Sequence, residues 1–217
     1  MSASVYLGAG TTLSSSYYVR RFYSENENAR TTTKRKQLSN STLSNADAHA
    51  LRQAVKSLGS FSYDDVNSTN IRNNVKAFVS TYNNLMSSAA DSQDRKTIQN
   101  AKNIKNLTNE YADDLDKLGI TVNADGTLEA RTALLNTTSI SKFEKLFSSD
   151  TDYMQRVNSF AKRIEQRGST LYLEEQHALR LKSESAANAA ANTKETVGVD
   201  LNSLLNNGIG SNINISL

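Results

Sequence analysis

Apolar residues recur with the period of an α-helix over most of this chain. The clearest stripe lies between residues 71 and 86, where the apolar positions fall on one broad face of a helix. Its members are Ile71, Val75, Phe78, Val79, Tyr82, Leu85 and Met86. A face this wide is typical of a buried helix, so the pattern predicts that other helices pack on both sides of it.

A shorter amphipathic helix is predicted before this stripe. Ser44 and Asp47 form a variant of the capping box, in which a hydroxyl precedes the first turn and a carboxylate lies within it. Apolar residues then recur at i, i+3, i+4 and i+7, namely Leu51, Ala54, Val55 and Leu58. We therefore expect a helix that begins near Ser44 and that Gly59 ends.

A third helix is predicted between Asp91 and about Leu118. Its apolar residues recur with near-heptad spacing and are Ile104, Leu107, Tyr111, Leu115 and Leu118. This spacing favours a shallow, coiled-coil-like antiparallel pairing with the preceding helix. Gly119 follows directly and is expected to end the helix.

The sequence after Gly119 predicts a β-hairpin. Two short β-prone segments, 120–122 and 127–129, enclose the residues Asn-Ala-Asp-Gly at 123–126. Asp-Gly tolerates the positive φ angles that tight hairpin turns require. An isolated two-stranded hairpin is only marginally stable, so we expect this one to lie against the helices.

The helical pattern returns after the hairpin. Two short helices are expected at residues 130–136 and 141–147, and a long helix is expected from Asp150. Gly168 lies within that helix, where glycine costs roughly 1 kcal/mol relative to alanine without necessarily breaking it. Glycines within residues 196–217 are expected to end it.

The chain is therefore expected to have three parts: a flexible N-terminal arm at 1–42, a helical bundle domain at 43–195 and a flexible tail at 196–217. The predicted fold is mainly α, an antiparallel bundle or coiled-coil-like stalk with one small β-hairpin. Apolar residues in the two terminal segments are candidate partner contacts: Tyr17, Tyr18, Phe22, Leu201, Leu204 and Leu205. A second interpretation of the N-terminal cluster is that it docks the arm onto the chain's own core.

The composition supports a helical chain. No Pro occurs in the 217 residues, whereas a chain of this length usually holds roughly ten. Few rigid loops are therefore needed. The absence of Cys excludes a disulfide framework, a thiolate metal site and a cysteine nucleophile. The apolar fraction of 37% is low, which suits narrow helical seams better than a thick sandwich.

No pattern of catalytic, cofactor-binding or metal-ligating residues stands out, so we predict a non-enzymatic protein. His49 and His177 lie far apart, and each is expected to be a surface or boundary residue. The formal net charge is +3, and the basic cluster at 34–36 is too short to indicate nucleic-acid binding. No run of about 18 apolar residues occurs, so no membrane insertion is expected.

Several short sequence motifs follow one another in an order that can be compared with known families. Residues 75–86 read VKAFVSTYNNLM, with a Phe-Val pair followed by Tyr-Asn, and residues 115–130 read LDKLGITVNADGTLEA. The short helices then end in KLF at residues 145–147, and Gly168 follows in the long helix. In this order and at this separation, these motifs resemble the C-terminal helical region of flagellar filament-capping proteins, the cap-type hook-associated proteins.

The resemblance implies a structural protein of the bacterial flagellum. The chain resembles a short or divergent member of this family, one that keeps the helical stalk domain and lacks the outer β domains. The expected partners are further copies of the chain, forming a homo-oligomer, and flagellin or other flagellar axial proteins. The resemblance also implies an extracellular location, reached without a cleaved signal peptide. An alternative is a cytoplasmic helical adaptor or export chaperone of the flagellar system.

Overall fold

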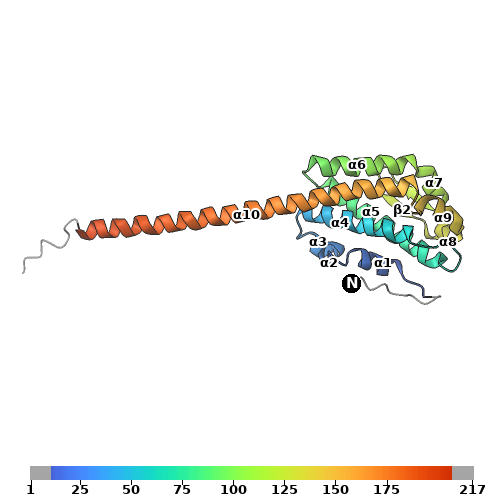
Figure 1. The fold of residues 1–217 in the computed structure, drawn as a ribbon, viewed down its shortest axis with the longest axis horizontal. Helices are drawn as coiled ribbons and strands as arrows, with labels where there is room; N and C mark the ends of the chain where they lie inside the picture. Colours follow the sequence, from blue (N-terminus) through green and yellow to red (C-terminus); the bar gives the residue numbers. More distant parts are fainter. Residues whose placement is uncertain (1–10, 207–217) are drawn as a thin grey trace, which may run out of the picture. The chain divides into compact units, whose positions relative to one another are not determined.

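The structure is a computed structural model that describes the backbone of residues 11–206 and the side chains of residues 11–189 (Figure 1). The chain divides into two units, Met1–Tyr172 and Leu173–Leu217. The described residues form helices and one two-stranded antiparallel sheet. The prediction of a mainly α fold with one small hairpin is therefore confirmed.

The elements follow one another in the order α1 (Ser15–Phe22), α2 (Glu27–Arg30), α3 (Thr32–Arg35), α4 (Asn40–Gly59), α5 (Ser68–Ala90), α6 (Arg95–Glu110), α7 (Ala112–Lys117), β1 (Ile120–Val122), β2 (Leu128–Ala130), α8 (Thr132–Thr137), α9 (Ile140–Phe147) and α10 (Asp152–Asn206).

The helices α4 and α5 form an antiparallel pair. Near their connection, the Asn74 side-chain amide of α5 donates to the Ser57 hydroxyl of α4 over 2.6 Å. At the opposite end of the pair, the Asn40 amide donates to the Asp91 carbonyl over 2.7 Å. Because later residues of α4 meet earlier residues of α5, the two helices run in opposite directions.

The part of α10 within the first unit packs antiparallel to α4. The Asn45 amide, early in α4, donates to the Glu165 carbonyl over 2.6 Å. Arg52, almost two turns later, donates through Nε to the Asn158 side chain over 3.3 Å. The residue numbers rise along one helix as they fall along the other, which fixes the direction.

The same part of α10 also packs antiparallel to α6. Arg167 Nε lies 2.9 Å from the carboxylate of Asp94, the residue before α6. Late in α6, the Thr108 hydroxyl lies 3.3 Å from the Tyr153 hydroxyl. The four long helices α4, α5, α6 and α10 therefore alternate in direction within the first unit (Figure 1).

The predicted apolar stripe of α5 lies in the core of the bundle. Six of its seven residues are buried, and Met86 is half-buried. The Phe78 ring packs edge-on against Phe147 of α9, with 5.5 Å between ring centroids, and also against Tyr153 of α10. The helices α9 and α10 therefore meet α5 at this ring. The wide stripe of α5 thus has several packing neighbours, as its pattern predicted.

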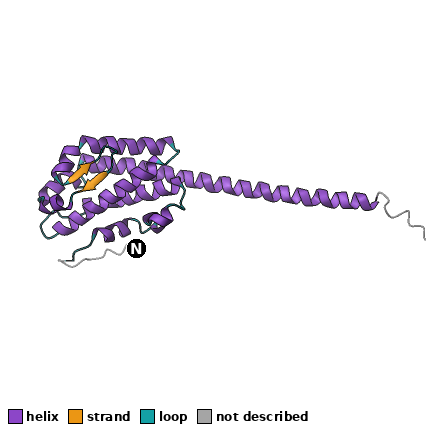
Figure 2. Ribbon diagram, turned by 180° about the vertical axis from the view of Figure 1, so that it is seen from behind, coloured by secondary structure: helices purple, strands orange, loops and turns teal. Residues whose placement is uncertain are grey.

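The hairpin forms between α7 and α8 as predicted, with its second strand beginning one residue later (Figure 2). The Asn123 N–H donates to the Thr127 carbonyl over 2.8 Å and closes a loop of three residues. Gly126 supplies the left-handed position of this loop with φ +86°. Gly119, with φ +87°, follows α7 and provides the turn into β1.

The segment at 15–35 differs from the flexible arm that the sequence predicted. It forms α1, α2 and α3, and α1 packs against α4 and α5. The backbone N–H of Leu13 donates to the side chain of Asn70 of α5 over 2.8 Å. Burial of aromatic side chains, which removes large apolar areas from water, outweighs the turn-forming tendency of the surrounding serines. Residues 1–10 of the predicted arm lie outside the described part of the chain.

Two helix boundaries also differ from prediction. α4 begins at Asn40 because the Ser39 hydroxyl accepts a backbone N–H of its first turn. Asp47 is therefore an interior residue of α4 and no capping carboxylate. The third predicted helix is divided at Tyr111, whose backbone (φ −102°, ψ 14°) leaves the helical region and separates α6 from α7.

The predicted tail is partly helical. The helix α10 continues to Asn206, so the glycine at position 198 does not end it. A single interior glycine costs only roughly 1 kcal/mol, which the rest of a long helix can offset. Residues 207–217 lie outside the described part of the chain.

Candidate functional site

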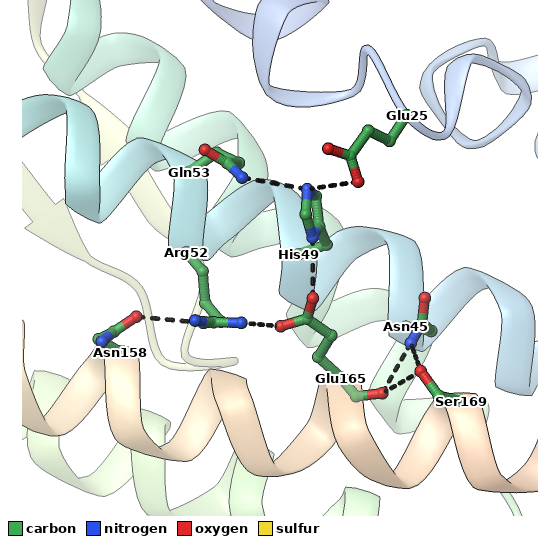
Figure 3. A network of polar contacts seen from close by, with 8 residues as sticks. All are labelled: Glu25, Asn45, His49, Arg52, Gln53, Asn158, Glu165 and Ser169. Carbon is green, nitrogen blue, oxygen red and sulfur yellow. Dashed lines mark hydrogen bonds and ion pairs between the residues drawn. The ribbon is translucent and has the colours of Figure 1, made fainter. Parts of the chain in front are cut away.

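A cluster of charged and polar side chains lies between α4, α10 and the segment after α1 (Figure 3). His49 Nδ1 is 2.8 Å from Glu165 Oε1, and Arg52 binds the other oxygen of this carboxylate. The second ring nitrogen, His49 Nε2, lies 3.2 Å from the Gln53 amide and 3.5 Å from the Glu25 carboxylate. One imidazole thus contacts side chains from three segments of the chain.

The helical period of α4 places this cluster on one face. Asn45, His49 and Arg52 are separated by four and three residues, so they face α10 together. The Asn45 amide donates to the backbone carbonyl of Glu165 over 2.6 Å and to the Ser169 hydroxyl over 2.9 Å. The close approach of the two helices therefore brings both the backbone and the side chain of Glu165 into the cluster.

Glu165 carries the negative charge at the centre of this cluster. Burial alone would raise the pKa of its carboxyl, but hydrogen bonds from His49 and Arg52 outweigh that effect and lower the pKa below its usual range. The carboxylate is therefore ionised at neutral pH. Its role is that of a fixed acceptor that holds two side chains of α4 against α10.

The contacts of His49 indicate what the cluster can do. Nδ1 faces the Glu165 carboxylate of α10, and Nε2 faces the Gln53 amide of its own helix and the Glu25 carboxylate, so the ring joins α4 to two other segments (Figure 3). Within the described residues, no group of three or more His, Asp and Glu side chains is arranged to hold a metal ion. We interpret the cluster as a polar clamp between helices.

A second polar arrangement fixes the hairpin onto α5. The Asn83 side chain brackets Leu128 of β2, because its amide donates to the Leu128 carbonyl and its oxygen accepts the Leu128 N–H, each over 2.8 Å. The neighbouring Tyr82 hydroxyl donates to the carbonyl of Gly126 over 3.1 Å. These two consecutive residues therefore satisfy three backbone groups of the hairpin, and we call them the hairpin clamp.

The turn of the hairpin is also held from α6. Lys105 Nζ donates to the Asp125 carbonyl over 2.8 Å, and its methylene chain lies over Gly126. Asp125 Oδ1 accepts the backbone N–H of Thr127 over 2.8 Å, and hydrogen bonds from Thr127 lower the pKa of the exposed Asp125 carboxyl. The Asp-Gly pair thus has the turn role that the sequence predicted.

The candidate partner contacts near the N-terminus lie in the chain's own core. Tyr18 and Phe22 are each only 2% exposed, and Tyr17 is half-buried against them. Burial raises the pKa of Tyr18 to about 12. The structure thus agrees with the docking interpretation. Leu201, Leu204 and Leu205 lie in the helical backbone of α10, and their side chains are outside the described part of the chain.

A buried ion pair that the sequence did not reveal anchors the N-terminal segment. Asp47 of α4 is 0% exposed and receives both terminal nitrogens of Arg35, at 2.7 and 2.8 Å. The Tyr23 hydroxyl donates to the same carboxylate over 2.6 Å, and burial raises the pKa of Tyr23 well above its usual value. Spacing in the sequence could not pair these residues, because they meet only through tertiary packing.

Comparison with protein-family models, with curated proteins and with solved structures gives no match. None of the helices in the described part of the chain is long and apolar enough to cross a membrane.

Proposed function

We propose that the chain is a non-enzymatic structural protein that acts in the assembly of the bacterial flagellar filament, in the manner of cap-type hook-associated proteins. It works outside the cell through self-association and through contacts with flagellin or other axial proteins. The proposal rests on the order of the sequence motifs, and the geometry of those motifs supports it.

The hairpin clamp is the observation that carries the proposal. The Tyr-Asn pair of one motif, Tyr82 and Asn83, binds the backbone of the other motif at Gly126 and Leu128. Two motifs that are about 40 residues apart in sequence are therefore in direct contact. Because the two motifs contact each other, there is a physical reason for both to occur in one chain. Two unrelated chance similarities would have no such reason.

The second unit supports an assembly role. Every residue from Leu173 to Ala189 is exposed, including three leucines whose side chains are 49–67% exposed: Leu173, Leu179 and Leu181. Helices gain most of their stability from packing an apolar face, so an exposed helix that carries large apolar side chains is stabilised when a partner covers them. This half of α10 is therefore suited to bind other helices.

Location and partners test the proposal together. We would follow the chain in sheared flagella, culture supernatant and cell lysate, in wild-type cells and in cells that lack flagellar export. Export-dependent recovery with sheared flagella is expected. Recovery only from lysate in both strains would instead favour the cytoplasmic adaptor or export chaperone.

Binding experiments with purified proteins provide a second test of the proposed function. Purified chain is expected to self-associate in sedimentation velocity and to retain flagellin or a hook-junction protein in a pull-down. A buried-core variant is unsuitable as a control, so exposed Asn106→Asp on α6 serves instead and should leave both results unchanged. A strict monomer that ignores every axial protein would overturn the proposal.

A further inference from the structure

A broad hollow opens between the first turns of α6 and the facing turns of α10 in the first unit. Its volume is about 640 Å³, and its lining consists of charged and polar side chains. Four of them are cations: Arg95, Lys96, Arg163 and Arg167. The others are amides and one hydroxyl, so none of the described carboxylates lines the hollow.

This hollow carries a local excess of positive charge. Four cations line it, and Asp94 is the neighbouring carboxylate that pairs with one of them. The local sum of these five formal charges is therefore +3, and such a group of like charges attracts anions.

The rim of the hollow already binds one carboxylate. Asp94 accepts from Arg167 Nε over 2.9 Å and from the backbone N–H of Thr97 over 2.8 Å. Burial would raise the pKa of Asp94, but these hydrogen bonds outweigh it and lower the pKa. The start of α6 is thus capped from within, and an additional anion would be attracted by the side chains of the hollow.

The cations are placed to act together. Arg95 and Lys96 are exposed on α6, while the Arg163 guanidinium lies 5.6 Å from the centre of the Phe160 ring, which limits its freedom. They approach the hollow from two antiparallel helices, so an anion between the helices meets charge from both sides. We propose that this hollow binds the carboxylates of an acidic peptide segment on a partner protein.

The lining favours a peptide over a nucleic acid. Three of the four cations are arginines, whose planar fork binds carboxylates and phosphates alike, so the other residues of the lining must distinguish the two ligands. The amides of Gln99 and Gln166 both donate and accept, as the backbone of a bound peptide requires. In the part of the chain that the structure describes, no aromatic side chain lines the hollow, whereas single-stranded nucleic acids are usually bound by stacking on aromatic rings.

Binding of a labelled polyglutamate peptide to the full chain tests this inference. The affinity would be measured by fluorescence anisotropy at low and at physiological salt. Combined replacement of Arg95, Lys96 and Arg163 by Gln is expected to weaken binding by about tenfold or more, because charge-assisted hydrogen bonds are lost. Arg167 is retained because it holds Asp94.

A matched variant separates the site from general charge attraction. Replacement of Lys34, Lys142 and Lys145 by Gln removes the same charge from exposed positions elsewhere and should change the affinity by less than about twofold. Equal weakening by both variants, or no binding by the wild-type chain, would overturn the inference. So would tighter, hollow-dependent binding of a single-stranded oligonucleotide of equal charge.

Folding of the variants must be checked separately. Circular dichroism and the thermal midpoint of the triple variant should match those of the wild type, since its three residues are exposed. If the triple variant does not fold, the single charge reversal Arg163→Glu replaces it. That variant must also weaken peptide binding, and unchanged affinity would overturn the inference.

Discussion

Gly168 lies at a close approach of α10 to α4. A Cβ atom at this position would lie 2.6 Å from Asn45 Cβ and 3.0 Å from the Ser41 carbonyl oxygen. Both distances are too short for ordinary contacts, and one neighbour is backbone that cannot turn away. The glycine that looks like a weak point in a long helix is therefore required by helix packing.

Replacement of Gly168 by Ala should destabilise the first unit. In an exposed helix this change stabilises by roughly 0.5–1 kcal/mol, but overpacking at a close contact costs about 1–3 kcal/mol. We expect the overpacking to dominate in urea unfolding. The exposed Thr170→Ala, two residues away, should change stability by less than about 1 kcal/mol. A more stable Gly168→Ala variant would show that α4 and α10 do not meet here.

Titration of the Tyr82 phenol should make the free energy of unfolding depend on pH in the alkaline range. Burial raises the pKa of its phenol from 10.0 to about 12. Because the fold favours the neutral phenol, its contribution is complete below pH 10 and is lost as the pH rises towards 12. Two pKa units correspond to roughly 3 kcal/mol. The free energy of unfolding, measured from pH 8 to 12, should therefore fall less steeply in Tyr82→Phe than in the wild type, and parallel curves would contradict this.

At the level of secondary-structure elements, the stability of the hairpin depends on its contacts with α5. A two-stranded hairpin of this length is marginal by itself. The Asn83 side chain contacts both the N–H and the C=O of Leu128, which are backbone groups of β2. Docking therefore uses the polar backbone of the hairpin as well as its apolar residues.

Asn83→Asp should separate the hairpin from α5. A carboxylate still accepts the Leu128 N–H but cannot donate to the Leu128 carbonyl, so two acceptors would face each other. We expect a loss of roughly 2 kcal/mol, with faster amide exchange in β1 and β2. Asn106→Asp, exposed on α6, introduces the same charge and should leave hairpin exchange unchanged. Equal amide-exchange rates of β1 and β2 in the two variants would show that Asn83 does not hold the hairpin against α5.

The N-terminal helices depend on one buried carboxylate. Asp47→Asn would leave the Arg35 guanidinium, whose side chain is 17% exposed, without its counter-charge. Removing one partner of a buried pair costs about 3 kcal/mol or more. Faster proteolysis between α1 and α4 is expected, whereas exposed Asp65→Asn should have no effect. Unchanged protease resistance would show that aromatic packing alone holds this segment.

Local patterns predicted the elements whose causes are local. The α5 stripe and the Asp-Gly hairpin depend on nearby residues, so the stripe at 71–86 lies within α5 and the two hairpin strands were predicted to within one residue. The break at Tyr111 was not predicted, because Tyr111 continues the apolar spacing of α6 into α7. The pairing of Asp47 with Arg35, and the position of His49 beside Glu165, depend on tertiary packing that a periodic pattern does not contain.

The whole first unit combines these contacts into one arrangement. Four helices alternate in direction, and the hairpin and the short helices α7, α8 and α9 are inserted between the third and the fourth (Figure 1). The N-terminal helix α1 packs against α4 and α5. The sequence predicted the antiparallel bundle and the inserted hairpin. It left open whether the N-terminal aromatics serve a partner or the core, since both uses select the same residue types.

Self-association should depend on the exposed residues around the start of the second unit. Leu173, Leu179 and Leu181 are large apolar residues exposed in the second unit. Replacing all three by Ser should shift the full chain towards monomer in sedimentation velocity. The unfolding midpoint of the first unit should stay the same, because these residues are 49–67% exposed and lie outside that unit. Loss of stability without a change in association would mean that these residues serve the fold of their own chain.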